Sequence, residues 1–101
     1  MPNLYVGQTA ARLEFITGIS LESATEVEIR YYKPNGVFGK FPAIIVNPIK
    51  GVVAYDVESE GDLDDTGEWR FWVHVYFNDG TELDTKPIYI NIFEPGKKYI
   101  S

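Results

Sequence analysis

Polar and apolar residues alternate with a period of two along most of this chain, and turn residues interrupt the alternation about every 8–12 residues. The clearest example spans residues 25–33, where Val27, Ile29 and Tyr31 occupy alternate positions. This period puts successive side chains on opposite faces of a strand, whereas a helix needs apolar residues three and four apart. We therefore predict an all-β chain, a sandwich or barrel, of about seven antiparallel strands at residues 3–8, 11–17, 25–33, 37–47, 52–57, 68–77 and 88–93.

The chain is 101 residues long, which is an ordinary size for one domain, so we predict a single domain over residues 1–101. Aromatic residues make up 15% of the sequence, whereas disordered chains contain few of them. A chain of this length buries about two-thirds of its unfolded surface, which is enough for one hydrophobic core.

Acidic residues outnumber basic ones, and the net charge is −6 at pH 7. Such a surface repels phosphate backbones and anionic lipids, so we expect neither nucleic acid nor a membrane as a partner. The N-terminal residues lack the basic and apolar segments of a secretion signal, and no apolar run is long enough to span a bilayer. The absence of cysteine excludes disulfides and thiolate metal sites, and it fits folding in a reducing cytoplasm.

The sequence contains no recognisable catalytic set. His74 is the only histidine, so a multi-histidine metal site and a cysteine–histidine pair are both excluded. The serines lie in predicted loops or at the C-terminus, outside any strand–turn–helix nucleophile motif. No glycine-rich segment has the spacing of a phosphate-binding loop. We expect a protein without enzymatic activity, cofactor or resident metal.

An acidic loop over residues 58–65 leaves two alternatives open. The first is a solvated loop in which Asp64 or Asp65 bonds its own turn amides. The second is calcium binding, since clustered carboxylates supply the oxygen ligands that calcium prefers. The spacing does not match the helix-flanked calcium loop, because twelve residues counted from Asp62 end at Val73 rather than at a glutamate.

The run from Asp65 to Phe71 has the pattern aspartate, any residue, glycine, any residue, aromatic, any residue, core residue. It resembles the corner and strand start of immunoglobulin-like domains, with Trp69 at the corner aromatic and Phe71 at the core position. Residues 5–10, 18–36 and 61–80 together resemble a small immunoglobulin-like protein of tailed bacteriophages. The N-terminal domain of phage baseplate upper proteins is similar. The resemblance implies an immunoglobulin-like β-sandwich without enzymatic activity, made in the host cytoplasm and carried in the virion, on head, tail or baseplate.

The strand at 68–77 carries large side chains on both faces. With Trp69 and Phe71 directed into the core, alternate residues of this strand and of its neighbours at 25–33 and 88–93 point outward. Aromatic residues and arginine are enriched at protein interfaces, although aromatics also favour strands for packing reasons alone. We expect an interaction face that binds other virion proteins or a second copy of the chain, or alternatively a surface glycan of the host. The face comprises Tyr32, Arg70, Trp72, His74, Tyr76, Tyr89 and Phe93.

Overall fold

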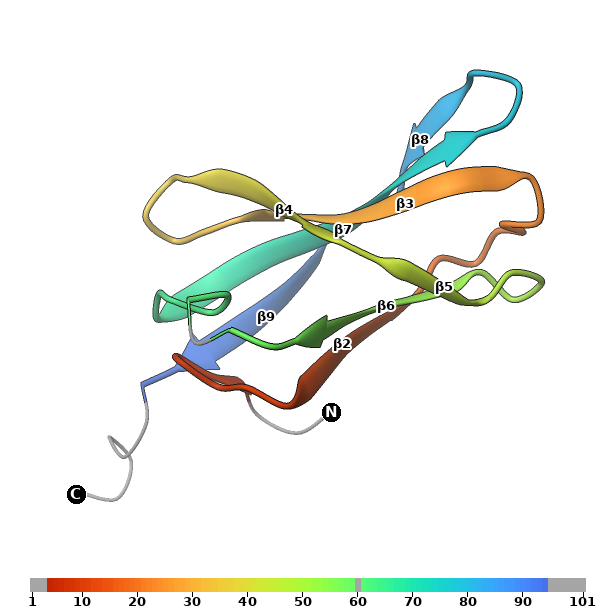
Figure 1. Cartoon of the computed structure of the whole chain (residues 1–101). Coiled ribbons are helices and arrows are strands. Elements are labelled where there is room, and N and C mark those ends of the chain that lie inside the picture. The colour runs from red at the N-terminus through yellow and green to blue at the C-terminus, as the bar shows by residue number, and fades with distance from the viewer. Residues whose placement is uncertain (1–3, 60, 95–101) are drawn as a thin grey trace.

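A computed structural model of the protein describes residues 4–59 and 61–94, and this part of the chain contains strands and no helix. Two sheets pack face to face, as Figure 1 shows. The larger sheet has the strand order β1-β9-β7-β3-β4, with β8 also paired to β7, and the smaller has the order β2-β6-β5. The strands are β1 (Leu4–Tyr5), β2 (Ala11–Ile16), β3 (Ala24–Tyr32), β4 (Phe38–Pro42), β5 (Ile44–Asn47), β6 (Val52–Val57), β7 (Gly67–Phe77), β8 (Glu82–Asp84) and β9 (Ile88–Phe93).

The predicted immunoglobulin-like β-sandwich is confirmed, with three differences in its strands. Strand β8 was not predicted. The segment 37–47 was expected as one strand, but it divides at Pro42–Ala43 into β4, which pairs with β3, and β5, which pairs with β6. Proline has no amide hydrogen to donate to a ladder, so the chain leaves the larger sheet there and enters the smaller one. The first strand is also shorter than expected and pairs with β9 in parallel.

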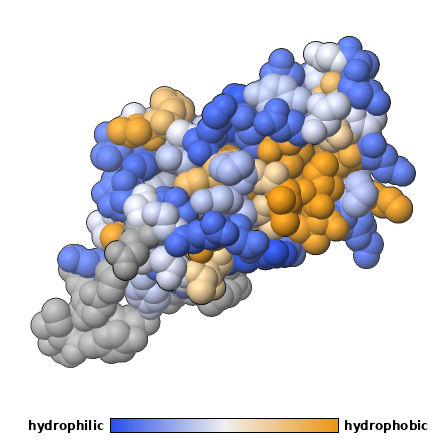
Figure 2. Space-filling view, in the orientation of Figure 1, coloured by the Kyte–Doolittle hydropathy of each residue, from blue (hydrophilic) through white to orange (hydrophobic). Residues whose placement is uncertain are grey.

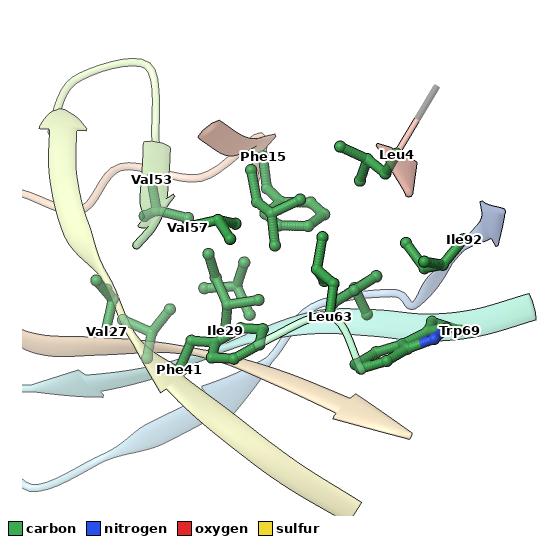
Figure 3. Packing of buried hydrophobic residues seen from close by; sticks show 14 of the residues in the cluster. Leu4, Phe15, Val27, Ile29, Phe41, Val53, Val57, Leu63, Trp69 and Ile92 are labelled. Carbon is green, nitrogen blue, oxygen red and sulfur yellow. The ribbon is translucent and has the colours of Figure 1, made fainter. Parts of the chain in front are cut away.

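One hydrophobic cluster fills the space between the sheets (Figure 3). Strand β7 contributes the fully buried side chains of Trp69 and Phe71, and β2 contributes that of Leu13. Ile88 of β9 alternates with the outward Tyr89, so we expected it to be buried, but it is 42% exposed. It lines a hollow of about 520 Å³ between β2 and the β8–β9 junction, where the smaller sheet does not cover the larger one.

Side-chain contacts hold the corner before β7 and the acidic loop that leads into it, and the contacts of the loop differ from those we expected. The indole Nε1–H of Trp69 donates to the carbonyl oxygen of Asp65 at 2.9 Å, as the hydroxyl of a corner tyrosine does in related sandwiches. The carboxylate that accepts backbone amides in the acidic loop belongs to Asp62, at 3.3 Å from the nitrogen of Ser59. Asp64, one of the two residues expected in that role, instead forms an ion pair with Lys33 at 2.7 Å.

Candidate interaction face

The outward face of the larger sheet brings three predicted rows of side chains together. In the pairing of β3 with β7, Tyr32 lies opposite Arg70. In the pairing of β7 with β9, Tyr89 also lies opposite Arg70. Cross-strand partners on one face of a sheet have Cβ atoms about 5 Å apart, so Arg70 is flanked by a tyrosine on each side.

The guanidinium of Arg70 lies between these two rings. Its central carbon is 5.2 Å from the ring centroid of Tyr32 and 5.7 Å from that of Tyr89. Both distances fall within the range of cation–π attraction. The stack fixes the position of the cation at the centre of the face.

Phe38 joins this group, although we did not predict it as part of the face. It pairs with Tyr32 across β3 and β4, and the two ring centroids are 4.4 Å apart. Its side chain is 67% exposed, and that of Tyr89 is 57% exposed. The residues Lys-Pro-Asn-Gly at 33–36 are typical of a tight turn, and the turn brings residue 38 back beside residue 32. We call Tyr32, Phe38, Arg70, Trp72 and Tyr89 the aromatic–arginine cluster.

Trp72 separates two shallow hollows on this face. One, of about 320 Å³, is also lined by Phe38, Arg70 and Asp84. The other, of about 350 Å³, is also lined by Arg30 and Lys40. A partly buried indole with open space on two sides offers apolar surface to a bound group without leaving the sheet.

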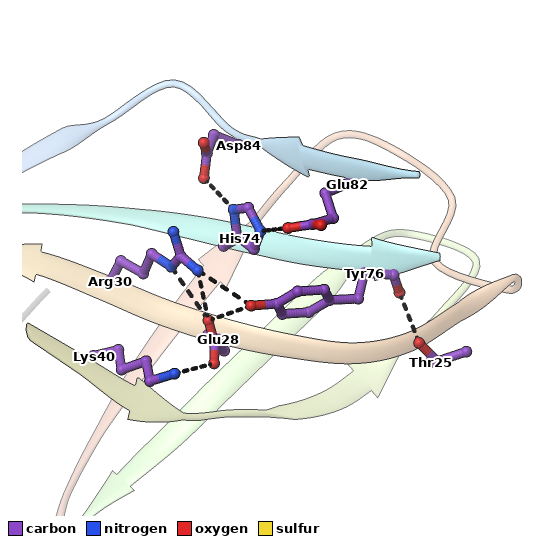
Figure 4. Close-up of polar contacts among 8 residues, drawn as sticks. All are labelled: Thr25, Glu28, Arg30, Lys40, His74, Tyr76, Glu82 and Asp84. Atoms are coloured by element: carbon purple, nitrogen blue, oxygen red, sulfur yellow. Dashed lines mark hydrogen bonds and ion pairs between the residues drawn. The ribbon is translucent and has the colours of Figure 1, made fainter. Parts of the chain in front are cut away.

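The end of the face near β8 is polar and internally bonded (Figure 4). Glu28 accepts hydrogen bonds from Arg30 at 3.1 Å and from the Tyr76 hydroxyl at 3.2 Å, and it forms an ion pair with Lys40 at 2.9 Å. Burial raises the pKa of Glu28, but the bonds from Lys40, Arg30 and Tyr76 outweigh it and hold the pKa below its ordinary value. Tyr76 is therefore part of a structural network.

His74 faces outward as expected, but only 7% of it is exposed, because carboxylates of β8 cover it. Its Nδ1 lies 2.6 Å from Asp84 and its Nε2 lies 2.7 Å from Glu82. Burial lowers the pKa of His74, but the hydrogen bonds to Asp84 and Glu82 raise it by a larger amount, so the pKa lies above its ordinary value. The imidazole is thus enclosed by β8, which corrects our expectation that it is available on the interaction face.

Phe93 lies at the opposite end of the same face. It pairs with Tyr5 of β1, and their ring centroids are 6.0 Å apart. The predicted face is therefore one surface with three parts: the aromatic–arginine cluster in the middle, the polar network at one end and Phe93 at the other. Residues 95–101 and Glu60 of the acidic loop lie outside the described residues.

A second exposed apolar area lies over β5 and the turn that follows it (Figure 2). It includes Ile44, Val46 and Ile49, and the last of these is 72% exposed. We did not predict this area, because we expected residues 37–47 to form one strand. The part that belongs to the smaller sheet was therefore not recognised as an edge strand with its own outward face.

Within residues 4–59 and 61–94, no group of three or more histidine, aspartate or glutamate side chains is arranged to hold a metal ion. The same part of the chain has no helix that is long and apolar enough to cross a membrane.

No protein-family model and no curated protein sequence matches this chain. Among solved structures, it is similar to CopC from Methylosinus trichosporium OB3b, with a TM-score of 0.59 over 94% of this chain and 87% of that one. The two sequences are 11% identical. At this identity the likeness supports a shared β-sandwich architecture and says nothing further about activity or ligands.

Proposed function

We propose that the protein is a non-enzymatic structural component of a bacteriophage virion, which docks on other virion proteins through the outward face of its larger sheet. The observation that carries this proposal is the aromatic–arginine cluster. Its aromatic rings surround Arg70, which lies between Tyr32 and Tyr89 on paired strands of the sheet. Large aromatics and arginine are the residues that dominate the energy of protein interfaces.

The position of the cluster favours docking, as its composition does. Residues on paired strands lose little freedom on binding, so less of the interaction energy is spent on ordering them. The resemblance of residues 18–36 and 61–80 to small immunoglobulin-like phage proteins supports the same function. The partners would be head, tail or baseplate proteins, or a second copy of the chain, and synthesis would precede assembly in the host cytoplasm.

Quantitative peptide mass spectrometry of purified particles from the source tests this proposal. The chain should be present in purified particles at a fixed ratio to the major capsid protein. Hundreds of copies indicate a site on the head, and a few to tens indicate a tail or baseplate. Absence from particles, with abundant chain in infected cells, would refute virion function.

The docking face is tested by a pair of substitutions at exposed residues. Phe38→Ser should reduce incorporation into particles, whereas Ile16→Ser should leave it unchanged. Ile16 is 77% exposed on the smaller sheet, so both variants remove a comparable exposed apolar side chain. Equal incorporation of the two variants would rule out the outward face of the larger sheet as the docking surface.

A second candidate function is carbohydrate binding for attachment to the host. The two hollows beside Trp72 and the exposed ring of Tyr89 favour it, because sugar rings stack on aromatic faces. Saturable quenching of tryptophan fluorescence by a host surface glycan, lost in Trp72→Phe, would support it. Fluorescence unchanged up to millimolar glycan would exclude it.

A further inference from the structure

We propose that Arg70 is a carboxylate-binding site, which receives an acidic side chain of the protein that docks on this face. The inference rests on the proposed function, since it takes the face as an interaction surface. It adds the chemical nature of the partner segment.

The first observation is that Arg70 lacks the partner that the other arginines have. Arg12 is bonded to Asp56 at 2.7 Å, and Arg30 is bonded to Glu28 at 3.1 Å. No carboxylate of the described chain pairs with Arg70, although acidic residues outnumber basic ones by 15 to 9 in the sequence. The buried Nε–H of Arg70 also has no acceptor among the described residues. A buried donor without an acceptor costs free energy, so the chain itself does not satisfy the guanidinium of Arg70 as it does those of Arg12 and Arg30.

The second observation is that the guanidinium is held in place before any partner arrives. The rings of Tyr32 and Tyr89 enclose it at 5.2 and 5.7 Å. A stacked guanidinium keeps its planar set of N–H donors, which matches the two oxygens of a carboxylate. Because the side chain is already ordered, binding costs less conformational entropy than at a free surface arginine.

The third observation concerns the charges around the site. Arg30 and Lys40 share the single carboxylate of Glu28, so this neighbouring group keeps an excess positive charge.

Asp84 lines the same hollow as Arg70, but it is bonded to His74 at 2.6 Å. Glu82 shares the same imidazole at 2.7 Å, so these two carboxylates keep an excess negative charge, which the excess positive charge of Arg30 and Lys40 offsets for an arriving carboxylate. Phe38 and Trp72 border the hollow, so an acidic residue followed by an apolar one is the segment that fits best.

The experiment uses a hexaglutamate peptide as the probe, with binding followed by calorimetry at low salt. Arg70→Gln should weaken binding about tenfold, because it removes a charge-assisted, paired hydrogen bond. Arg12→Gln makes the same change of charge on the smaller sheet and should leave the affinity within about twofold. Arg70→Lys keeps the charge but loses the planar fork, and it should weaken binding less than Arg70→Gln does. Circular dichroism confirms that each variant is folded.

Equal losses in Arg70→Gln and Arg12→Gln would overturn the site, because the peptide would then respond to net charge alone. The absence of any binding to the native protein would overturn it as well. Tighter binding of a hexagalacturonate, which carries its carboxylates on sugar rings, would overturn the choice of a protein partner.

Incorporation into particles separates this inference from the proposed function. If Arg70→Gln enters particles as well as the native chain does, while Phe38→Ser does not, the docking face stands and the role of Arg70 is refuted. If the native chain binds hexaglutamate through Arg70 but is absent from particles, the site stands and virion function is refuted.

Discussion

Two tryptophans of β7 point to opposite sides of the larger sheet. Trp69 is fully buried and bonded to the Asp65 carbonyl, whereas Trp72 is partly exposed on the outward face. We expect Trp69→Ala to lower the free energy of unfolding by about 3–5 kcal/mol, because it leaves a cavity in the core. Trp72→Ala should cost about 1 kcal/mol or less. Urea titrations of both variants check the pair, and a large loss in Trp72→Ala would show that this ring belongs to the core.

Gly39 is required by the ring that lies over it. It pairs with Tyr31 across β3 and β4, and a Cβ at this position would collide with the ring and hydroxyl of Tyr31. That ring cannot move aside easily, because it also packs on Trp69 and Phe41 at 5.2 and 4.8 Å.

Gly39→Ala should therefore destabilise the protein by about 1–3 kcal/mol, as overpacking does in other cores. Gly61→Ala is the matched control, since the nearest atom to its Cβ is 3.7 Å away. Thermal unfolding measures both variants, and a similar melting temperature for the two would disprove the steric argument.

At the scale of the elements, one titrating side chain adds to the backbone pairing between β7 and β8. His74 can donate to both Asp84 and Glu82 only when both of its nitrogens carry protons. Because the pKa of His74 is raised in the folded state, this contribution is complete below the unfolded pKa of about 6.5. It is lost as the pH rises through the folded value.

We expect the stability of the native protein to fall as the pH rises above about 6.5, and the fall to be smaller in His74→Gln. The Thr85 amide, which donates to the Val73 carbonyl at 2.9 Å, reports the loosening of this edge. Its hydrogen exchange, corrected for intrinsic rates, should lose protection over the same range. An identical pH dependence in His74→Gln would mean that another group is responsible.

The elements also show what the sequence could and could not predict. The alternation on β3 and β7 is set by burial of one face, so the facing of Val27, Ile29, Trp69 and Phe71 followed from it. The division of residues 37–47 between two sheets did not follow, because an apolar run around a proline fits a strand on either sheet. The enclosure of His74 depends on β8, whose three residues carry no apolar pattern to predict a strand.

The candidate site could also be predicted only in part, because alternation predicts the facing of its residues but not their contacts. The outward positions of Tyr32, Arg70 and Tyr89 follow from alternation once their strands are neighbours. The missing partner of Arg70 depends on where every carboxylate lies in space, which pattern reasoning does not give.

At the scale of the whole molecule, the smaller sheet ends in an edge strand with exposed apolar side chains. Ile44 is 54% exposed on β5, and no charged residue occurs between Lys40 and Lys50. Edge strands of this kind tend to pair with other chains, and natural proteins protect them with lysine and proline. Here Pro42 and Pro48 flank β5 and limit the length that can pair.

This edge should set the limit to solubility at high concentration. Ile44→Lys places a charge at the start of β5, so we expect it to delay aggregation in concentrated solution at raised temperature. The native stability should change by about 0.5 kcal/mol or less, because the side chain is largely exposed. Light scattering over time measures the delay. Ile16→Lys adds the same charge to β2, the other edge of the smaller sheet, where Arg12 and Glu14 already interrupt the apolar surface. A delay of equal size in both variants would assign the effect to net charge, and a delay confined to Ile44→Lys would assign it to the β5 edge.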